Sequence, residues 1–298
     1  METLNSTFQD LIKQTVSVSK SSTVITEHNV YQPGVEEVLP FLDKVVETLI
    51  LPGSGISGME HLHELRDKAG SGKACLLLLE HYSNLDLPIF SYLLRKEQGA
   101  DIDRALVAIA GLKLNEASPT VAAFTGAYTR VIIYPSRSRR GLDPEKDKAE
   151  KIRSLGINRA AMKVLSEIKV QGKLVLVFPA GTRYRPWDPD TKRGVREIDS
   201  YIKSFDYMCL VAINGQVLHV RPGDMMDDYV SHDVVRFTAS PVLSCPEFRN
   251  TVRADAEAAG IEDKKQAMVD RIMARLEEMH NEAAGEREKL LHPSQGLF

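Results

Sequence analysis

The sequence predicts an α/β fold: a mainly parallel mixed sheet flanked by helices, with a small N-terminal helical region. Two observations lead to this class. From about residue 70 onward, short and strongly apolar runs alternate with longer amphipathic stretches. The runs are apolar at consecutive positions, which is typical of strands covered by helices on both faces. In such sheets, ligands bind beyond the carboxyl ends of the strands.

The first 50 residues are expected to be helical. Phe8, Leu11, Ile12 and Val16 recur at helical spacing, and a second such stripe runs from Leu39 to Leu49. The glycine-rich stretch "LPGSGISG" (51–58) then interrupts the pattern and is interpreted as a linker. These features divide the 298 residues into an N-terminal helical region, 1–55, and an α/β domain, 56–298.

The remaining elements follow from the same alternation. The expected strands are "KACLLLLE" (73–80), "ALVAIAG" (105–111), "RVIIYP" (130–135), "KLVLVFP" (173–179), "YMCLVAIN" (207–214) and "DVVRFTASPV" (233–242). The expected helices are 86–98, 115–125, 147–170 and 262–284. The last one carries an apolar stripe from Val269 to Met279.

Composition limits the classes of protein. Hydrophobic residues make up 43% and charged residues 27% of the chain, which is typical of a folded domain and not of a disordered segment. No apolar run approaches the ~20 residues of a membrane span. The three cysteines are widely spaced, without a CxxC pair, and we expect no secretory leader. We therefore expect unpaired thiols and a cytoplasmic location, with reversible contact to a membrane surface left open.

The charge is distributed unevenly. The chain has a net charge of −3, but residues 130–196 hold 17 Lys and Arg against 7 Asp and Glu, a net charge of +10. This excess gathers around turns. A charge run is most often a solvated face, and that interpretation stays open. The concentration at turns suits an anionic ligand, and we expect no nucleic acid as partner.

The stretch "EHYSNLD" (80–86) offers a candidate catalytic pair, His81 and Asp86, where a buried strand should end and a helix begin. Two readings stay open. Asp86 could simply cap the following helix, beside an ordinary turn histidine. Alternatively, Asp86 could orient His81 and stabilise its protonated form, as the acid of a catalytic triad does. No nucleophile stands at a matching position, which favours a reaction whose substrate supplies one.

Other familiar motifs are absent. "GSGKA" lacks the upstream glycine of a P-loop and has Ala74 where Ser or Thr would hold magnesium. There is no G-x-S-x-G elbow, and the histidine pair in "EHLHEL" lacks further ligands nearby. We therefore expect neither a metal nor a cofactor.

Two strand ends carry arginine clusters. "LVLVFPAGTRYRPW" (174–187) leads through a turn of small residues into Arg183 and Arg185. "RVIIYPSRSRRG" leads into Arg137 and Arg139. Forked guanidinium donors at two such turns favour a phosphate group as ligand.

These residues, taken together, resemble a known family. His-x4-Asp followed about 95 residues later by F-P-x-G-T-R is similar to the glycerolipid acyltransferases, over roughly residues 70–215. "GTRYRP" further resembles the G-R-x-R-P doublet of the soluble, plastid-type glycerol-3-phosphate acyltransferases. Two positions depart from the wider family: Ala180 replaces the glutamate of F-P-E-G-T-R, and Glu80 stands where relatives often have asparagine.

The resemblance implies an acyl transfer from acyl carrier protein or acyl-CoA to the sn-1 hydroxyl of glycerol 3-phosphate. His81 would be the base and Asp86 its partner. Arg137, Arg139, Arg183 and Arg185 would hold the phosphate, and the turn at Gly181 and Thr182 would offer donors to the oxyanion. Two alternatives remain: acylation of lysophosphatidate, and a non-catalytic protein that binds anionic lipid.

Overall fold

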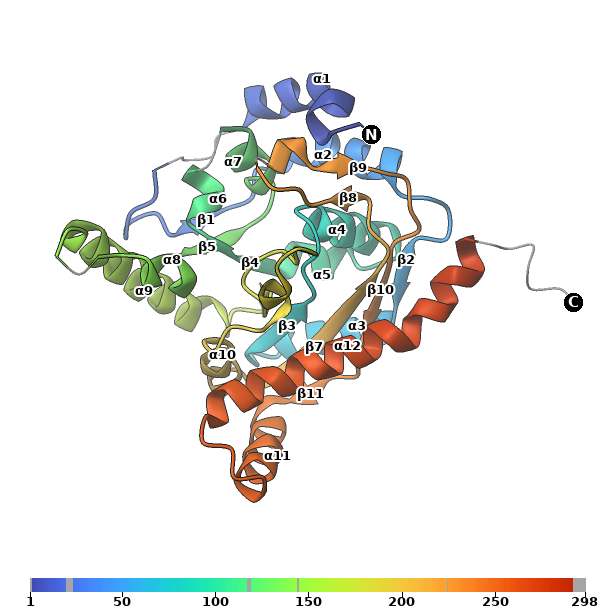
Figure 1. Ribbon diagram of the computed structural model, residues 1–298. Coiled ribbons are helices and arrows are strands. Elements are labelled where there is room, and N and C mark those ends of the chain that lie inside the picture. The colour runs from blue at the N-terminus through green and yellow to red at the C-terminus, as the bar shows by residue number, and fades with distance from the viewer. Residues whose placement is uncertain (1, 20–23, 117–118, 144, 224, 292–298) are drawn as a thin grey trace, which may run out of the picture.

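The computed structural model describes residues 2–19, 24–116, 119–143, 145–223 and 225–291. Within these ranges, a nine-stranded sheet forms the centre of the molecule, in the order β1-β5-β4-β6-β3-β7-β10-β2, with β11 paired to β7 (Figure 1). Its strands are β1 (Tyr31–Gln32), β2 (Gly55–Ser57), β3 (Cys75–Leu79), β4 (Leu106–Gly111), β5 (Arg130–Ile133), β6 (Leu174–Val177), β7 (Tyr207–Asn214), β10 (Arg236–Ala239) and β11 (Leu243–Ser244). A separate hairpin pairs β8 (Leu218–His219) with β9 (Tyr229–Val230).

Helices surround this sheet. The α-helices are α1 (Leu4–Val18), α2 (Leu39–Leu49), α3 (Met59–Gly70), α4 (Asp86–Lys96), α5 (Ala100–Ala105), α6 (Lys113–Glu116), α7 (Pro119–Thr125), α8 (Ser136–Arg140), α9 (Lys148–Ile168), α10 (Ile198–Ser204), α11 (Cys245–Ala258) and α12 (Lys264–Leu291). Short 3-10 turns are η1 (Glu36–Val38), η2 (Pro189–Lys192) and η3 (Met225–Asp227).

The central strands confirm the predicted parallel sheet. Strands β5, β4, β6, β3 and β7 pair in parallel. At the edges, β1 pairs antiparallel with β5, and β10 and β11 pair antiparallel with β7, while β2 pairs in parallel with β10. The carboxyl ends of β3 and β6 therefore lie side by side. The loops that follow these two strands begin with Glu80 and Phe178, so the two motifs meet at one edge of the sheet.

The core consists of two main apolar layers, one on each face of the sheet. Alternate residues of β3 supply both layers: Leu77 and Leu79 pack with α1, α2, α4 and α5, while Leu76 and Leu78 pack with α9, α10, α11 and α12. All five residues of β3 are buried. This is why the strand is apolar at every position and not at every second one.

The edges of the sheet differ from the prediction. Tyr31–Gln32 and Gly55–Ser57, expected in a helical region and a linker, are short strands at opposite edges. Their partners, Arg130–Val131 and Arg236–Thr238, lie about 100 and 180 residues away in the chain. Two or three residues carry no periodicity of their own, so this pairing is set by the neighbouring strand. The predicted helix 115–125 is two helices, α6 and α7.

The N-terminal helices pack onto the sheet. Leu4, Phe8 and Ile12 of α1 are buried and belong to the same core cluster as Leu42 of α2 and Leu77 of β3. The division at residue 55 stays a prediction. In the described part of the chain, no helix combines the length and the apolar character needed to cross a bilayer.

Candidate functional site

His81 and Asp86 face each other at the carboxyl end of β3. The loop after β3 carries His81, and Asp86 is the first residue of α4. Nδ1 of His81 lies 3.0 Å from Oδ2 of Asp86. Only 14% of the His81 side chain and 6% of the Asp86 side chain are exposed, so water competes little for this contact. The loop thus folds the imidazole back onto the carboxylate.

Asp86 also holds the loop in place. Its Oδ2 accepts hydrogen bonds from the backbone amides of Tyr82 (2.7 Å) and Ser83 (2.8 Å), and its Oδ1 accepts one from the Ser83 hydroxyl (2.8 Å). All of these donors precede α4, and no side-chain hydrogen bond caps the helix at its N-cap residue, Leu85. The carboxylate therefore organises the loop and contacts the imidazole, and it does not cap the helix.

A ring contact with Phe178, in the loop after β6, holds His81 in place. The imidazole stacks on Phe178, with ring centroids 3.9 Å apart and planes inclined by 20°. The His81 carbonyl accepts a hydrogen bond from the Tyr184 amide (2.8 Å). In the neutral tautomer whose Nδ1 donates to the Asp86 carboxylate, Nε2 carries the free lone pair. In the described residues, Nε2 has no hydrogen-bond partner, so it is available to a substrate.

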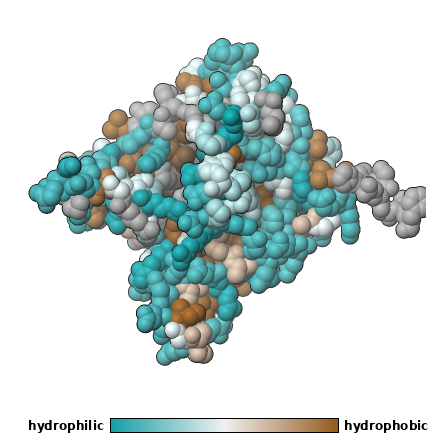
Figure 2. Space-filling model, viewed as in Figure 1, coloured by the Kyte–Doolittle hydropathy of each residue, from teal (hydrophilic) through white to brown (hydrophobic). Residues whose placement is uncertain are grey.

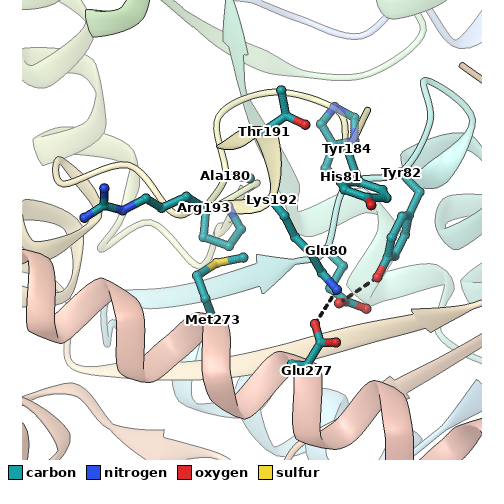
Figure 3. A pocket seen from close by; sticks show the side chains of 11 residues that line it. Glu80, His81, Tyr82, Ala180, Tyr184, Thr191, Lys192, Arg193, Met273 and Glu277 are labelled. Atoms are coloured by element: carbon teal, nitrogen blue, oxygen red, sulfur yellow. Dashed lines mark hydrogen bonds and ion pairs between the residues drawn. The ribbon is translucent and has the colours of Figure 1, made fainter. Parts of the chain in front are cut away.

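The pocket beside His81 has a volume of about 280 Å³. Three segments line it: residues 80–82, the turn and loop that contribute Pro179, Ala180, Tyr184 and 191–193, and Met273 and Glu277 of α12. Figure 3 shows His81 and Tyr82 on one side of the pocket, Arg193 and Met273 on the other, and Lys192 between them. A histidine, two cationic side chains and apolar side chains thus line one cavity.

The predicted phosphate ligands are spread more widely than the motif suggested. Arg183 forms an ion pair with Asp228, whose side chain is fully buried. A buried carboxylate without its cation is strongly unfavourable, so this pair holds the turn to the β8–β9 region. Arg183 does not line the pocket.

The other three arginines lie around the loop that closes the pocket. The Arg185 amide donates to Thr191 Oγ1 (2.8 Å), and Thr191 is a lining residue. Arg137, exposed on α8, donates from Nη2 to the carbonyls of Asp190 (3.4 Å) and Arg193 (3.3 Å). Arg139 is also exposed on α8. The two arginine-bearing turns are therefore neighbours, as the parallel sheet requires.

The small-residue turn has a specific backbone shape. Gly181 adopts a left-handed φ of +65°, and a Cβ there would lie 3.2 Å from Cγ1 of Val195, so glycine suits this position. The Gly181 amide donates to the Phe178 carbonyl (2.9 Å). In this conformation, that amide is not free to bind an oxyanion. Thr182 is half-buried beside it.

Sequence reasoning missed several lining residues. Lys192 and Arg193 belong to the basic segment 130–196, and no sequence motif distinguishes them from its other cations. In the structure, both line the pocket. Lys192 is ion-paired with Glu277 of α12, and Figure 3 shows this contact across the cavity. The apolar periodicity of α12 indicated which of its residues are buried in the core. It gave no role to Glu277, which lies beside those residues. No group of three or more potential metal ligands occurs in the described ranges.

Glu80 is the centre of a buried network next to His81. It is 6% exposed, and its Oε2 accepts from the Ile213 amide (2.8 Å) and lies 3.4 Å from Nδ1 of His280. Its Oε1 accepts from the Tyr82 hydroxyl (3.0 Å). The hydrogen bond that Glu80 accepts from His280 raises the pKa of His280 above 6.5, against burial and the Lys192 charge, which lower it. Burial, reinforced by Glu80, raises the pKa of Tyr82 well above its usual range. Tyr82 therefore stays a neutral donor.

This network predicts a pH-dependent contribution to stability. Because the folded-state pKa of His280 is raised, its stabilising effect is complete below about pH 6.5 and is lost as the pH rises through the folded pKa. We expect His280→Gln to lower the melting temperature by a few degrees at about pH 5.5 and much less at about pH 8.5. Thermal melts at both pH values measure this. His28→Gln, which changes an exposed histidine, should show no such pH difference.

The comparisons with known proteins add one finding. A protein-family model described as acyltransferase matches residues 55–223, more than half of the chain. The matched segment includes His81, Asp86, both arginine turns and Lys192, whereas α12 lies beyond it. No curated protein matches the chain.

Proposed function

Because the chain belongs to the acyltransferase family, we propose that it moves a fatty acyl group from an acyl thioester to the sn-1 hydroxyl of glycerol 3-phosphate. The donor is acyl-CoA or acyl carrier protein. The observation that carries the proposal is the contact of His81 Nδ1 with Asp86, in a histidine that lines the same pocket as Lys192 and Arg193. A base and cations in one cavity suit a hydroxyl acceptor that bears a phosphate.

The chemistry follows from these positions. Nε2 of His81 removes the proton of the acceptor hydroxyl as its oxygen attacks the thioester carbonyl. Asp86 stabilises the imidazolium that forms. The tetrahedral intermediate collapses, the C–S bond breaks, and the departing thiolate takes the proton from His81. Both substrates meet in one site, so the step needs no acyl-enzyme.

The side chains near the site support direct transfer. The described cysteines, Cys75, Cys209 and Cys245, are buried, and burial raises their pKa to about 12, so they remain neutral thiols. The hydroxyl of Thr191 donates to the Asp188 carbonyl (2.6 Å) and is therefore occupied. These contacts leave the acceptor hydroxyl as the nucleophile that His81 can serve.

Release of free thiol from acyl-CoA or acyl carrier protein, measured with and without glycerol 3-phosphate, tests the proposal. We expect release that depends on the acceptor and yields 1-acylglycerol 3-phosphate. Faster release with lysophosphatidate than with glycerol 3-phosphate, at the same donor concentration, would mean that lysophosphatidate is the acceptor. No release with either acceptor would favour a protein that binds anionic lipid without catalysis.

The phosphate contact makes a prediction about Lys192 and Arg193. In this proposal they bind the phosphate together with Arg185 and with Arg137 and Arg139 of α8, while Arg183 holds the turn. Lys192→Ala and Arg193→Ala should each raise the KM for glycerol 3-phosphate about tenfold, as expected for a lost charged hydrogen bond. The KM for the acyl donor should change little. Initial-rate kinetics with each substrate varied in turn measure both constants.

A matched control lies three residues away. Arg196 is exposed and pairs with Asp263 outside the pocket, so Arg196→Ala should leave both KM values unchanged. Arg183→Ala should mainly lower the melting temperature, because it leaves Asp228 buried without its cation. Equal KM effects for Lys192, Arg193 and Arg196 would contradict a phosphate site in the pocket.

A further inference from the structure

Helix α9 exposes an unusual set of apolar side chains. In the described part of the chain nine large hydrophobic residues are exposed, and three of them, Ile152, Leu155 and Met162, belong to α9. Ile152 is 72%, Leu155 53% and Met162 47% exposed. At 100° per residue these three point the same way, opposite the buried Ile157 and Leu165. Scattered exposed apolar residues are ordinary, but a stripe along one helix is not.

Cations outnumber carboxylates along this stripe: from Ile152 to Val170 there are four Lys and Arg, and the one acidic residue is the exposed Glu167. Arg159 and Lys163 lie on the same face as the apolar residues, and Lys151 borders it; all three are exposed. From residue 151 to residue 166 the chain has four Lys and Arg and no Asp or Glu. We call Ile152, Leu155, Arg159, Met162 and Lys163 the α9 outer face.

The N-terminal helices offer no comparable face. From the sequence, either the N-terminal helices or the basic region could contact a membrane surface. In the structure, Leu4, Phe8 and Ile12 of α1 are buried in the core. Figure 1 shows α9 protruding at one side of the molecule, beside α8, and Figure 2 shows brown atoms among teal on that lobe. Arg137 of α8 contacts the pocket loop, so the lobe adjoins the rim of the pocket.

We propose that the α9 outer face is a docking surface for an anionic lipid bilayer. The aliphatic side chains enter the boundary between headgroups and acyl chains, while Arg159 and Lys163 contact lipid phosphates. A protruding single helix favours lipid over a protein partner. A stable protein interface needs about 800 Å² of complementary surface on each partner, whereas lipids close around separate side chains on a convex surface. The inference does not depend on which acceptor is acylated.

Vesicle co-sedimentation tests the proposal without any activity measurement. The wild-type chain should pellet with vesicles of phosphatidylcholine and phosphatidylglycerol, but much less with phosphatidylcholine alone. The triple variant Ile152→Gln, Leu155→Gln, Met162→Gln keeps every charge and should lose at least tenfold in bound fraction at low salt. The double variant Arg159→Gln, Lys163→Gln keeps the aliphatic groups and should lose the preference for phosphatidylglycerol.

A control separates α9 from α1. Val16 is 37% exposed on α1, and Val16→Gln should bind like the wild type. All substituted positions are exposed, so unchanged melting temperatures are expected and would show that the variants fold. The proposal is wrong if the triple variant binds like the wild type, if Val16→Gln abolishes binding, or if phosphatidylglycerol makes no difference. Binding to purified acyl carrier protein that the triple variant loses, without vesicle binding, would likewise overturn it.

Discussion

Replacement of His81 by alanine is expected to lower the turnover number by about 10²–10⁴-fold, the usual contribution of a positioned base. The fold should survive, because His81 belongs to a loop whose shape rests on Asp86 and the amides of Tyr82 and Ser83. The structural losses are the stacking contact with Phe178 and the hydrogen bond to Asp86, whose carboxylate keeps three other donors. Melting temperatures and initial rates of thiol release measure the two effects separately.

Added imidazole sharpens this experiment. The alanine variant leaves a space between Asp86 and the pocket that a free imidazole can fill, so part of the rate should return with added imidazole. His219→Ala serves as the matched control, since His219 is bound to Ser231 (2.8 Å) away from the pocket. A folded His81→Ala chain with near-normal turnover would rule out His81 as the base.

The sequence predicted the centre of the fold well because burial determines it. Each central strand is covered on both faces, so an uninterrupted apolar run is enough to predict it. Strands β3 and β7 coincide with such runs. The edges were missed for the opposite reason. β1 and β2 are two and three residues long, and they are held by strands distant in the chain.

The candidate site was predictable only in part. His81 and Asp86 share one loop, so their spacing limits their geometry. The pocket itself depends on contacts between distant segments: Lys192 meets Glu277 of α12, and Glu80 meets His280. The periodicity of a single helix or loop cannot predict such pairs, because each partner resembles an ordinary exposed charge in its own segment.

Arg183 illustrates a further limit. In the motif "GTRYRP", Arg183 and Arg185 cannot be told apart by sequence, and either could bind a phosphate. What distinguishes them is the buried Asp228, 45 residues later, which takes Arg183 as its partner. A carboxylate excluded from water needs a cation more than an exposed substrate phosphate does. The role of each arginine in a doublet therefore depends on its buried surroundings.

Asp86→Asn should lower turnover by about 10²–10⁴-fold with only a small loss of stability. The amide oxygen of asparagine can replace Oδ2 and accept from His81 Nδ1 and from the amides of Tyr82 and Ser83. Its NH₂ group then faces the Ser83 hydroxyl, which can rotate to accept. Asparagine keeps the loop but lacks the negative charge that stabilises an imidazolium. Initial rates and thermal melts of this single variant measure charge and structure independently.

Two further variants make the result decisive. Asp86→Ala removes the acceptor of two buried amides, so it should destabilise the protein by several kcal/mol, at about 1–3 kcal/mol for each unpaired group. Asp199→Asn changes another buried aspartate, which pairs with Arg249 away from the pocket, and it should reduce stability without reducing turnover. If Asp86→Asn retains normal turnover, the carboxylate only shapes the loop. A large rate loss at nearly unchanged melting temperature, absent in Asp199→Asn, would instead mean that the charge of Asp86 acts through His81.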